Sequence, residues 1–189
     1  MIGSVRRRRG SERGQSLVEF ALFLPILIVL MLGIGELARV FSTMIAVESG
    51  AREAADYGAM QPGYWDAAAV PPAYLYTLSE MERRACTPTR SMTEYAGAAD
   101  GTTCTNPAFE CELYLPGSGV WTDCSIVGSA AVCSSLSGSD DTPCKVRVRM
   151  TYVYEMVVPT QLLGLPNTLT FTQESVFNIA VCRSCEESG

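Results

Sequence analysis

The chain lacks histidine entirely, since none occurs among its 189 residues. This absence excludes Ser-His-Asp and Cys-His mechanisms, because both use an imidazole as the general base. Glycine-rich phosphate-binding loops are lacking too, because the G-x-G stretches at 33–35 and 117–119 stand in an apolar run and in a lone turn. Carboxylates are numerous but scattered, and the adjacent pair at 140–141 is typical of a solvated loop. We therefore expect a protein that is not an enzyme, with no catalytic residues and no cofactor.

Basic residues are scarce after position 14. The formal net charge is −6, but residues 1–14 carry five of the 14 basic residues and one of the 20 acidic residues, Glu12. Without that segment 9 basic and 19 acidic residues remain, which gives a net charge of −10. Phosphate binding requires clustered lysine and arginine, so this acidic composition excludes nucleic acid as a partner.

Cysteine, in contrast, is plentiful, and every cysteine follows the one long apolar run of the chain. An even number of cysteines on the outer side of a membrane indicates a disulfide framework. Eight cysteines allow 105 pairings, and the sequence leaves the choice among them open. The candidates are Cys86, Cys104, Cys111, Cys124, Cys133, Cys144, Cys182 and Cys185.

Cys182 and Cys185 have the C-x2-C spacing of zinc and thiol-redox sites. A zinc site would need a second such pair or histidine ligands, and because the chain has neither, four thiolates would have to gather from irregular spacings. A redox pair usually opens a helix whose dipole lowers a thiol pKa, and no helix is predicted after Cys185. Structural disulfides are therefore favoured over redox chemistry, and no metal is expected.

The arginines at 6–9 precede an uncharged apolar run at 20–35. Positive charge resists translocation, so the N-terminus is expected inside the cell and the C-terminal part outside. Sixteen residues give roughly 24 Å of helix, short of the roughly 30 Å bilayer core, so flanking apolar turns are expected to complete the span. The prediction is a single pass through the lipid bilayer.

Glu19 stands at the edge of this run, directly before Phe20. An ionisable group there is costly enough to be a functional hypothesis by default. A glycine followed five residues later by glutamate and then phenylalanine, ahead of an apolar helix, resembles the processing site of type IV pilin-like proteins. The resemblance implies that a prepilin peptidase cuts between Gly14 and Gln15, and that Glu19 and Phe20 serve assembly.

More narrowly, the segment resembles the TadE-like pseudopilins of the tight-adherence pilus machinery. The matching features are the VEFA stretch at 18–21, the Leu-Pro step at 24–25 and the exit from the apolar run at 33–39. The resemblance is strong over residues 10–58 and weaker over 145–181, with none between those blocks. It implies other pilin and pilus-assembly subunits as partners.

Cleavage after Gly14 would leave Gln15 with a free, positively charged α-amino group. Glu19 is its natural counter-ion, because a carboxylate in low dielectric is costly alone and compensated beside an ammonium. The resemblance implies that this pair forms between subunits of a filament. The alternative interpretation is that Glu19 extends to the cytoplasmic interface or pairs with the arginines before processing.

A secretory signal peptide cleaved near 49–51 is a second interpretation of the N-terminal segment. The apolar run is longer than the usual h-region of about 7–15 residues, and charged residues separate it from that site. A retained helix is therefore favoured. The predicted organisation is a cytoplasmic basic leader at 1–14 and a transmembrane and amphipathic stem helix at 15–60.

Small residues recur at every fourth position of the predicted stem, at Ala46, Gly50, Ala54 and Gly58. Such a strip lets another backbone approach closely. Two interpretations stay open: the strip packs on the globular domain of its own chain, or it packs on a neighbouring helix in an assembly.

A linker and a cysteine-rich extracytoplasmic insert are predicted at 61–144. Residues 73–86 can form a short helix with apolar residues on one side. Residues 111–115 and 120–124 flank a Pro-Gly-Ser-Gly turn and have the pattern of a β-hairpin.

A pair of strands and a tail are predicted at 145–189. Residues 146–152 alternate apolar and polar side chains, the pattern of a half-buried strand, and 169–180 form the second strand. The expected fold class is α+β: a long N-terminal membrane-spanning helix followed by a small antiparallel β-sheet domain with a cysteine-rich insert.

The predicted function is that of a TadE-like minor pilin or pseudopilin in the bacterial cytoplasmic membrane, processed by a prepilin peptidase and taking part in the assembly of a tight-adherence pilus. The alternative is a permanently membrane-anchored, disulfide-rich surface protein that binds a ligand and has no filament role. Processing at Gly14 separates the two.

Overall fold

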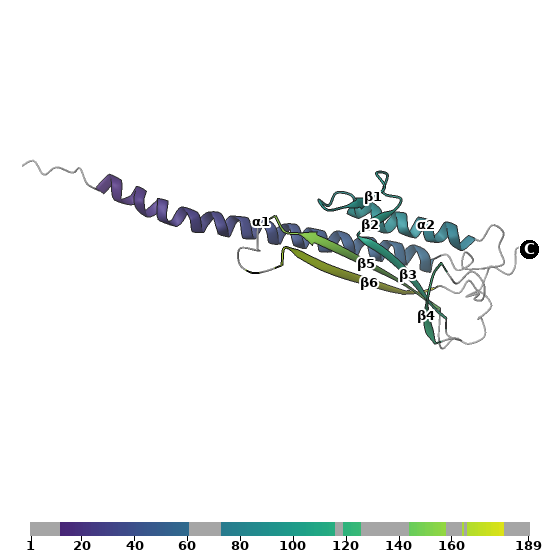
Figure 1. The fold of residues 1–189 in the computed structure, drawn as a ribbon. Helices are drawn as coiled ribbons and strands as arrows, with labels where there is room; N and C mark the ends of the chain where they lie inside the picture. The colour runs from purple at the N-terminus through teal and green to yellow at the C-terminus, as the bar shows by residue number, and fades with distance from the viewer. Residues whose placement is uncertain are drawn as a thin grey trace, which may run out of the picture. The chain divides into compact units, whose positions relative to one another are not determined.

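The computed structural model describes residues 12–60, 73–115, 119–125, 144–157, 164 and 166–179, and the structural statements below concern these residues. Two compact units are distinguished, Met1–Arg39 and Val40–Gly189, and each is described by itself. Figure 1 shows the helices and strands that they contain. The fold class is α+β, as predicted, with a long apolar N-terminal helix followed by antiparallel sheets and two disulfides.

Helix α1 (Glu12–Ala59) contains Pro25 and continues through it. Its apolar residues between positions 14 and 35 are exposed throughout. From Gly14 onward, α1 is the one helix in the described part of the chain that is long and apolar enough to cross a membrane, judged by length and composition. The predicted single continuous helix is therefore confirmed.

Helix α2 (Ala73–Cys86) has the bounds predicted from the sequence, and the 3-10 turn η2 (Thr87–Thr89) follows it directly. Arg83 and Arg84 occupy the last turn of α2, where positive charge interacts favourably with the helix dipole. Pro88 in η2 has no backbone N–H to extend the α-helical hydrogen bonding, so the helix ends at Cys86.

Two antiparallel sheets are described in the unit Val40–Gly189. A two-stranded sheet pairs β1 (Ala96–Gly97) with β2 (Cys104–Asn106). A four-stranded sheet has the order β4-β3-β5-β6. Its strands are β3 (Ala108–Leu115), β4 (Val120–Asp123), β5 (Lys145–Glu155) and β6 (Thr168–Asn178).

The predicted hairpin is present as β3 and β4, and the two predicted C-terminal strands are present as β5 and β6. β5 pairs with β6 from Lys145↔Asn178 to Glu155↔Thr168 without a register shift. β5 also pairs with β3, so strands from the cysteine-rich segment and from the C-terminal segment build one sheet.

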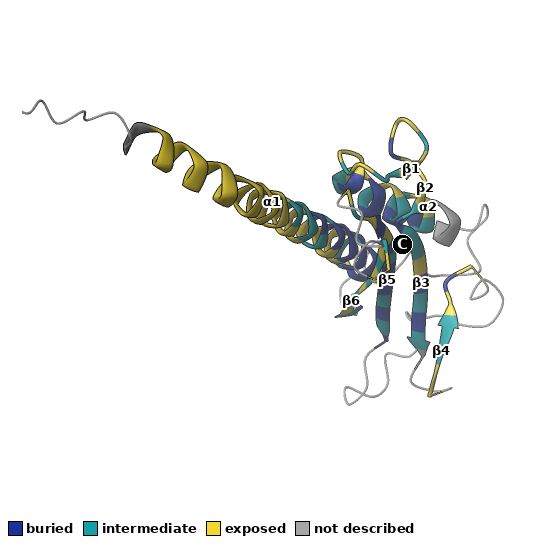
Figure 2. Ribbon diagram, turned by 60° about the vertical axis from the view of Figure 1, so that its left-hand side comes forward, coloured by how far each residue is buried: buried dark blue, intermediate teal, exposed yellow. Residues whose placement is uncertain are grey.

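One face of β5 forms the centre of the core. Even-numbered side chains from Val146 to Tyr154 are buried, and the odd-numbered ones are half-buried or exposed, which is the period of a strand with one covered face. The last turns of α1 cover this row together with α2. Figure 2 shows the buried colour concentrated in these elements. Their fully or nearly buried members include Val47, Ala51, Ala54, Ala55, Met81 and Ala85.

The strip of small residues on α1 packs within its own chain. A methyl group added at Gly50 would lie 2.4 Å from the carbonyl oxygen of Ala85 in α2 and 3.2 Å from Met150 Sδ in β5. One added at Gly58 would lie 2.8 Å from Met81. Close approach of α1 to α2 is therefore the reason for the small residues, and the first of the two interpretations holds for this face.

Candidate functional site

The four residues predicted to serve processing and assembly lie near the start of α1. Gly14, Gln15, Glu19 and Phe20 are all exposed. Gln15 Nε2 donates a hydrogen bond to Glu19 Oε1 at 3.1 Å. The two side chains thus lie on one face of the helix, one turn apart, as residues i and i+4 do.

Beyond Glu19, the next charged residue of α1 is Glu36. Glu36 accepts a hydrogen bond from Arg39, with 3.5 Å between Arg39 Nη1 and Glu36 Oε2. The apolar segment of α1 therefore has a carboxylate at one end and an ion pair at the other. A charge that is paired costs less at a membrane boundary than a charge that is alone.

Two disulfides join Cys86 to Cys104 and Cys111 to Cys124. All four residues are buried. The first bond connects the end of α2 to the start of β2, and the second connects β3 to the residue after β4. The disulfide framework predicted from the cysteine count is confirmed for these four candidates.

Of the other four candidates, Cys144 is buried directly before β5. Cys133, Cys182 and Cys185 lie outside the described residues, so the interpretation of the C-x2-C pair stays a prediction. Among the residues that the structure describes, no group of three or more cysteine, aspartate or glutamate side chains is placed to hold a metal ion.

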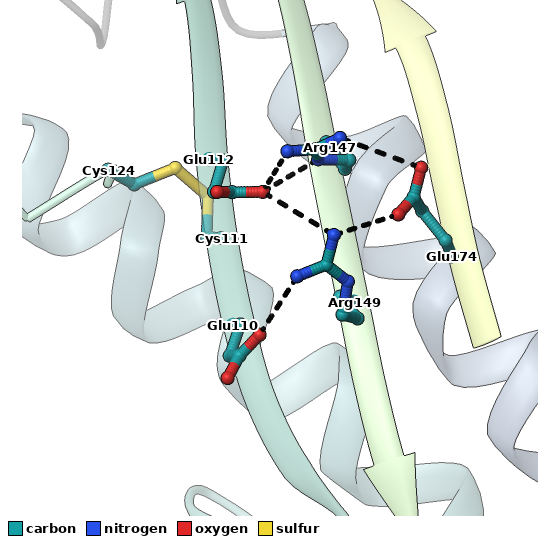
Figure 3. Close-up of polar contacts among 7 residues, drawn as sticks. All are labelled: Glu110, Cys111, Glu112, Cys124, Arg147, Arg149 and Glu174. Atoms are coloured by element: carbon teal, nitrogen blue, oxygen red, sulfur yellow. Dashed lines mark hydrogen bonds and ion pairs between the residues drawn. A yellow bond between two sulfur atoms is a disulfide. The ribbon is translucent and has the colours of Figure 1, made fainter. Parts of the chain in front are cut away.

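The outward face of the four-stranded sheet carries a network of five charged side chains from three strands (Figure 3). We call this set the charge network. It consists of Glu110 and Glu112 from β3, Arg147 and Arg149 from β5, and Glu174 from β6.

Arg147 is held from several sides. Its Nε and Nη2 atoms lie 2.6 Å and 2.5 Å from Glu112 Oε2, and its Nη1 atom lies 3.8 Å from Glu174. The guanidinium group also stands 4.1 Å from the ring centroid of Trp121, within the range of a cation–π interaction. Trp121 in turn contacts Tyr114, with 5.4 Å between the ring centroids. Arg147 thus ties β4 to the sheet.

Arg149 contacts carboxylates on both neighbouring strands. Its Nη2 atom lies 3.1 Å from Glu174, and its Nη1 atom lies 3.5 Å from Glu110. The hydrogen bond with Glu174 raises the pKa of Arg149 above its ordinary value. Exposed ion pairs of this kind each contribute little to stability. We therefore assign to the charge network chiefly a role in fixing the register of the strands.

Polar contacts join Glu94, before β1, and Asn106, in β2, to β5. Tyr152 is fully buried, and its hydroxyl donates a hydrogen bond to Glu94 Oε2 at 2.6 Å. Burial, together with this bond, raises the pKa of Tyr152. Asn106 donates to the carbonyl oxygens of Glu94 and Val153 at 2.8 Å and 2.9 Å, and accepts from the Val153 N–H at 2.9 Å. No pattern in the sequence indicated these partners.

Two glutamates of α2 lie in different surroundings. Hydrogen bonds from Arg83, assisted by Arg84, lower the pKa of Glu80. Burial raises the pKa of Glu82, although the Cys104 N–H donates a hydrogen bond to its carboxylate. Through this hydrogen bond Glu82 links α2 to the first disulfide. Removing its carboxylate from water costs free energy, which is why its pKa is raised.

The described residues thus combine a long apolar helix, a candidate membrane span with a glycine and a glutamate five residues apart near its start, with antiparallel sheets that two disulfides link. The family model described as TadE-like protein matches residues 14–56. The matched residues lie within the N-terminal block 10–58 on which the predicted TadE-like resemblance chiefly rests, and the match supports that resemblance for this part of the chain. Comparisons with curated proteins and with solved structures gave no match.

Proposed function

We propose that this protein is a minor pilin or pseudopilin of a tight-adherence pilus, cut by a prepilin peptidase between Gly14 and Gln15 and then assembled with other pilin subunits. The role is structural and not enzymatic. The observation that supports it most is that the TadE-like match begins at Gly14, the predicted cleavage residue, and continues along α1 to position 56.

The surroundings of Gly14 favour cleavage. Gly14 is the third residue of α1, and in the described part of the chain no group other than its neighbours and the backbone of α1 itself lies within 4 Å of where its side chain would stand. Backbone N–H groups in the first turn of a helix lack intrahelical partners, and glycine destabilises a helix by about 1 kcal/mol relative to alanine. Unwinding this turn to present an extended peptide bond to a peptidase therefore costs little.

The geometry of Gln15 and Glu19 supports a role in assembly. Their side chains already meet on one turn of α1. After cleavage the α-amino group of Gln15 would stand on the same turn, and its positive charge would compensate the Glu19 carboxylate in a low-dielectric environment. We propose that the pair forms between the Gln15 amine of one subunit and Glu19 of another, so that Glu19 reports correct insertion into the filament.

The proposed orientation places residues 1–14 inside the cell and the sheet domain outside. The arginine cluster resists translocation. Buried disulfides between Cys86 and Cys104 and between Cys111 and Cys124 form and persist in an oxidising environment, which the cytoplasm does not supply. The arginine cluster and the disulfides therefore support the same topology across the lipid bilayer.

The N-terminal mass of the membrane-extracted protein tests the processing step. It is measured from cells with and without an active prepilin peptidase, with a Gly14→Val variant as the matched control. We expect a terminal peptide that begins at Gln15 in peptidase-containing cells and an intact N-terminus in the other two samples.

Other N-termini would support other interpretations of the protein. An intact Met1 in all samples would refute processing and favour the permanently anchored surface protein. A terminus near Arg52 would indicate a secreted protein. A peptide beginning at Gln15 but lighter by one ammonia would show that the glutamine has cyclised, which removes the amine and refutes the charge pair while leaving processing intact.

A further inference from the structure

The two disulfides join cysteines that follow one another in the sequence. Cys86 bonds to Cys104 and Cys111 bonds to Cys124, with sequence separations of 18 and 13, and no other cysteine lies inside either interval. Four cysteines allow three pairings, and the observed one joins the first to the second and the third to the fourth. This is the pairing that forms when each new cysteine meets its predecessor as the chain crosses a membrane.

We infer that a disulfide-bearing thiol oxidant on the outer side of the membrane introduces these two bonds in the order in which the cysteines emerge, and that their pairing needs no disulfide isomerase. The inference rests on the orientation that forms part of the proposed function. It adds a thiol oxidant to the partners of this protein and excludes a disulfide isomerase.

Two hydrogen bonds near the first disulfide are made within the segment that the disulfide closes. Thr89 Oγ1 donates to the carbonyl oxygen of Cys86 at 2.8 Å. The Tyr95 hydroxyl donates to the carbonyl oxygen of Thr103 at 3.1 Å. The segment between the two cysteines thus folds back through its own hydrogen bonds, and the two thiols can meet before β3 and the later strands are present.

The second disulfide is equally local. It closes the open end of the β3–β4 hairpin, where the Cys124 N–H donates to the carbonyl oxygen of Cys111 at 3.0 Å. The next pair in the register is Glu112↔Asp123. Hairpins form in about 1–10 μs, and this one needs neither β5 nor β6 to bring its cysteines together.

Burial sets a limit on when the oxidant acts. Cys86 and Cys124 are 0% exposed, and Cys104 and Cys111 are 6% exposed. Thiol–disulfide exchange requires a thiolate that the oxidant can reach. Oxidation must therefore precede the docking of β5 on β3, which completes the core.

Sequence distance alone would favour a different disulfide. Cys104 and Cys111 are seven positions apart, closer than either bonded pair, and the entropic cost of closing a loop falls as the loop shortens. At synthesis rates of about 5–20 residues per second, roughly 0.4–1.4 s separates the emergence of Cys104 from that of Cys111. The first bond must form within that interval for Cys104 to be unavailable to Cys111.

The chemistry of each bond is an exchange of two electrons. The Cys86 thiol loses its proton, and the thiolate attacks the disulfide of the oxidant, which forms a mixed disulfide and releases one oxidant thiolate. The Cys104 thiolate then attacks the Cys86 sulfur and displaces the second oxidant thiolate. The oxidant leaves as a dithiol that has accepted two electrons and two protons, and the same steps join Cys111 to Cys124.

Peptide mapping of the full-length protein tests the inference. The protein is extracted from three strains after rapid alkylation of thiols: a complete strain, one without the periplasmic disulfide isomerase and one without the thiol oxidant. Non-reducing digestion then identifies each cross-linked peptide. We expect both native cross-links at equal yield in the first two strains and their loss in the third.

Matched variants make the test sharper. Ala99 is exposed and lies between Cys86 and Cys104, whereas Thr170 is exposed and lies in β6, which emerges last. In the strain without isomerase, Ala99→Cys should divert Cys86 to the introduced thiol, and Thr170→Cys should leave both native bonds unchanged. Equal mispairing in the two variants would contradict oxidation in order of emergence.

Two failures remain distinguishable. A Cys104–Cys111 cross-link in the unmodified protein, confined to cells without isomerase, would overturn this inference and leave the proposed function standing. Alkylation of all four cysteines in the complete strain would mean that the sheet domain is not on the outer side, and would overturn the inference together with the proposed orientation.

Discussion

Substitution of Gly50 by alanine tests the packing of α1 directly. The added methyl group would lie 2.4 Å from the carbonyl oxygen of Ala85, 3.3 Å from the Ala85 carbonyl carbon and 3.2 Å from Met150 Sδ. The nearest obstacle is backbone, which yields less readily than the end of a side chain. α1 and α2 must separate by about 1 Å to restore ordinary contact distances.

The contacts around Ala85 resist this separation. Cys86, the next residue, is held by its disulfide to Cys104. Arg84 lies 3.6 Å from Glu53 of α1, and its guanidinium carbon stands 4.3 Å from the Tyr57 ring centroid. Forcing extra volume into a packed core costs about 1–3 kcal/mol, and the backbone obstacle places Gly50→Ala near the upper end.

Helix propensity opposes the clash. Replacing glycine by alanine inside a helix stabilises it by about 1 kcal/mol. The expected net effect of Gly50→Ala is therefore a loss of about 2 kcal/mol in the free energy of unfolding of the sheet domain. Urea unfolding of the full-length protein in detergent, followed by near-ultraviolet circular dichroism, measures this loss.

Control variants separate the two contributions. Ser49, the neighbouring residue of α1, is exposed, so substitutions there isolate helix propensity, and Ser49→Ala should be more stable than Ser49→Gly by about 1 kcal/mol. Gly58→Ala meets the flexible end of Met81 at 2.8 Å, so it should cost less than Gly50→Ala. If Gly50→Ala stabilises the protein, the close approach of α1 to α2 is wrong.

Three further predictions concern the first disulfide, the half-buried carboxylate of Glu82 and the proposed charge pair of Glu19. Joint replacement of Cys86 and Cys104 by alanine should lower the free energy of unfolding by about 3 kcal/mol, because the cross-link no longer restricts the unfolded chain; an unchanged urea midpoint would contradict this. Burial raises the pKa of Glu82, so this residue stabilises the fold below its unfolded pKa and that contribution is lost as the pH rises through the folded value. Glu82→Gln should therefore raise the melting temperature at pH 7 and leave it nearly unchanged at pH 3, and a variant less stable at pH 7 would refute the assignment. Glu19→Ala should leave membrane insertion intact and reduce piliation, and pili at normal levels in that variant would refute the charge pair.

The contacts that position the charge network show where sequence reasoning stops. The alternation along 146–152 correctly placed Arg147 and Arg149 on the wetter face of a strand. Their partners depend on the registers of β5 with β3 and with β6, and these partners are 25 to 39 positions away in the sequence. A shift of one residue would move every side chain to the opposite face, and nothing local in the sequence specifies that shift.

The small residues of α1 also show what the sequence leaves undecided. Their spacing indicated a close approach of a second backbone, and that much was correct. Whether the second backbone belonged to the same chain was undecided, because a strip of small residues has the same pattern in both situations. The close approach of the Ala85 backbone to Gly50 shows that, for this face, the second backbone belongs to the same chain.

The sequence by itself determined the long apolar helix, the alternating strands and the TadE-like resemblance, and it suggested a processing segment, because each depends on residues that are neighbours along the chain. Only the tertiary structure decided that Cys86 bonds to Cys104 and Cys111 to Cys124, and that strands from both sides of position 144 form one sheet. The physical reason is the range of the interactions. Helical and strand periods repeat every few residues, whereas disulfide partners and strand registers are chosen by which distant segments can share one core.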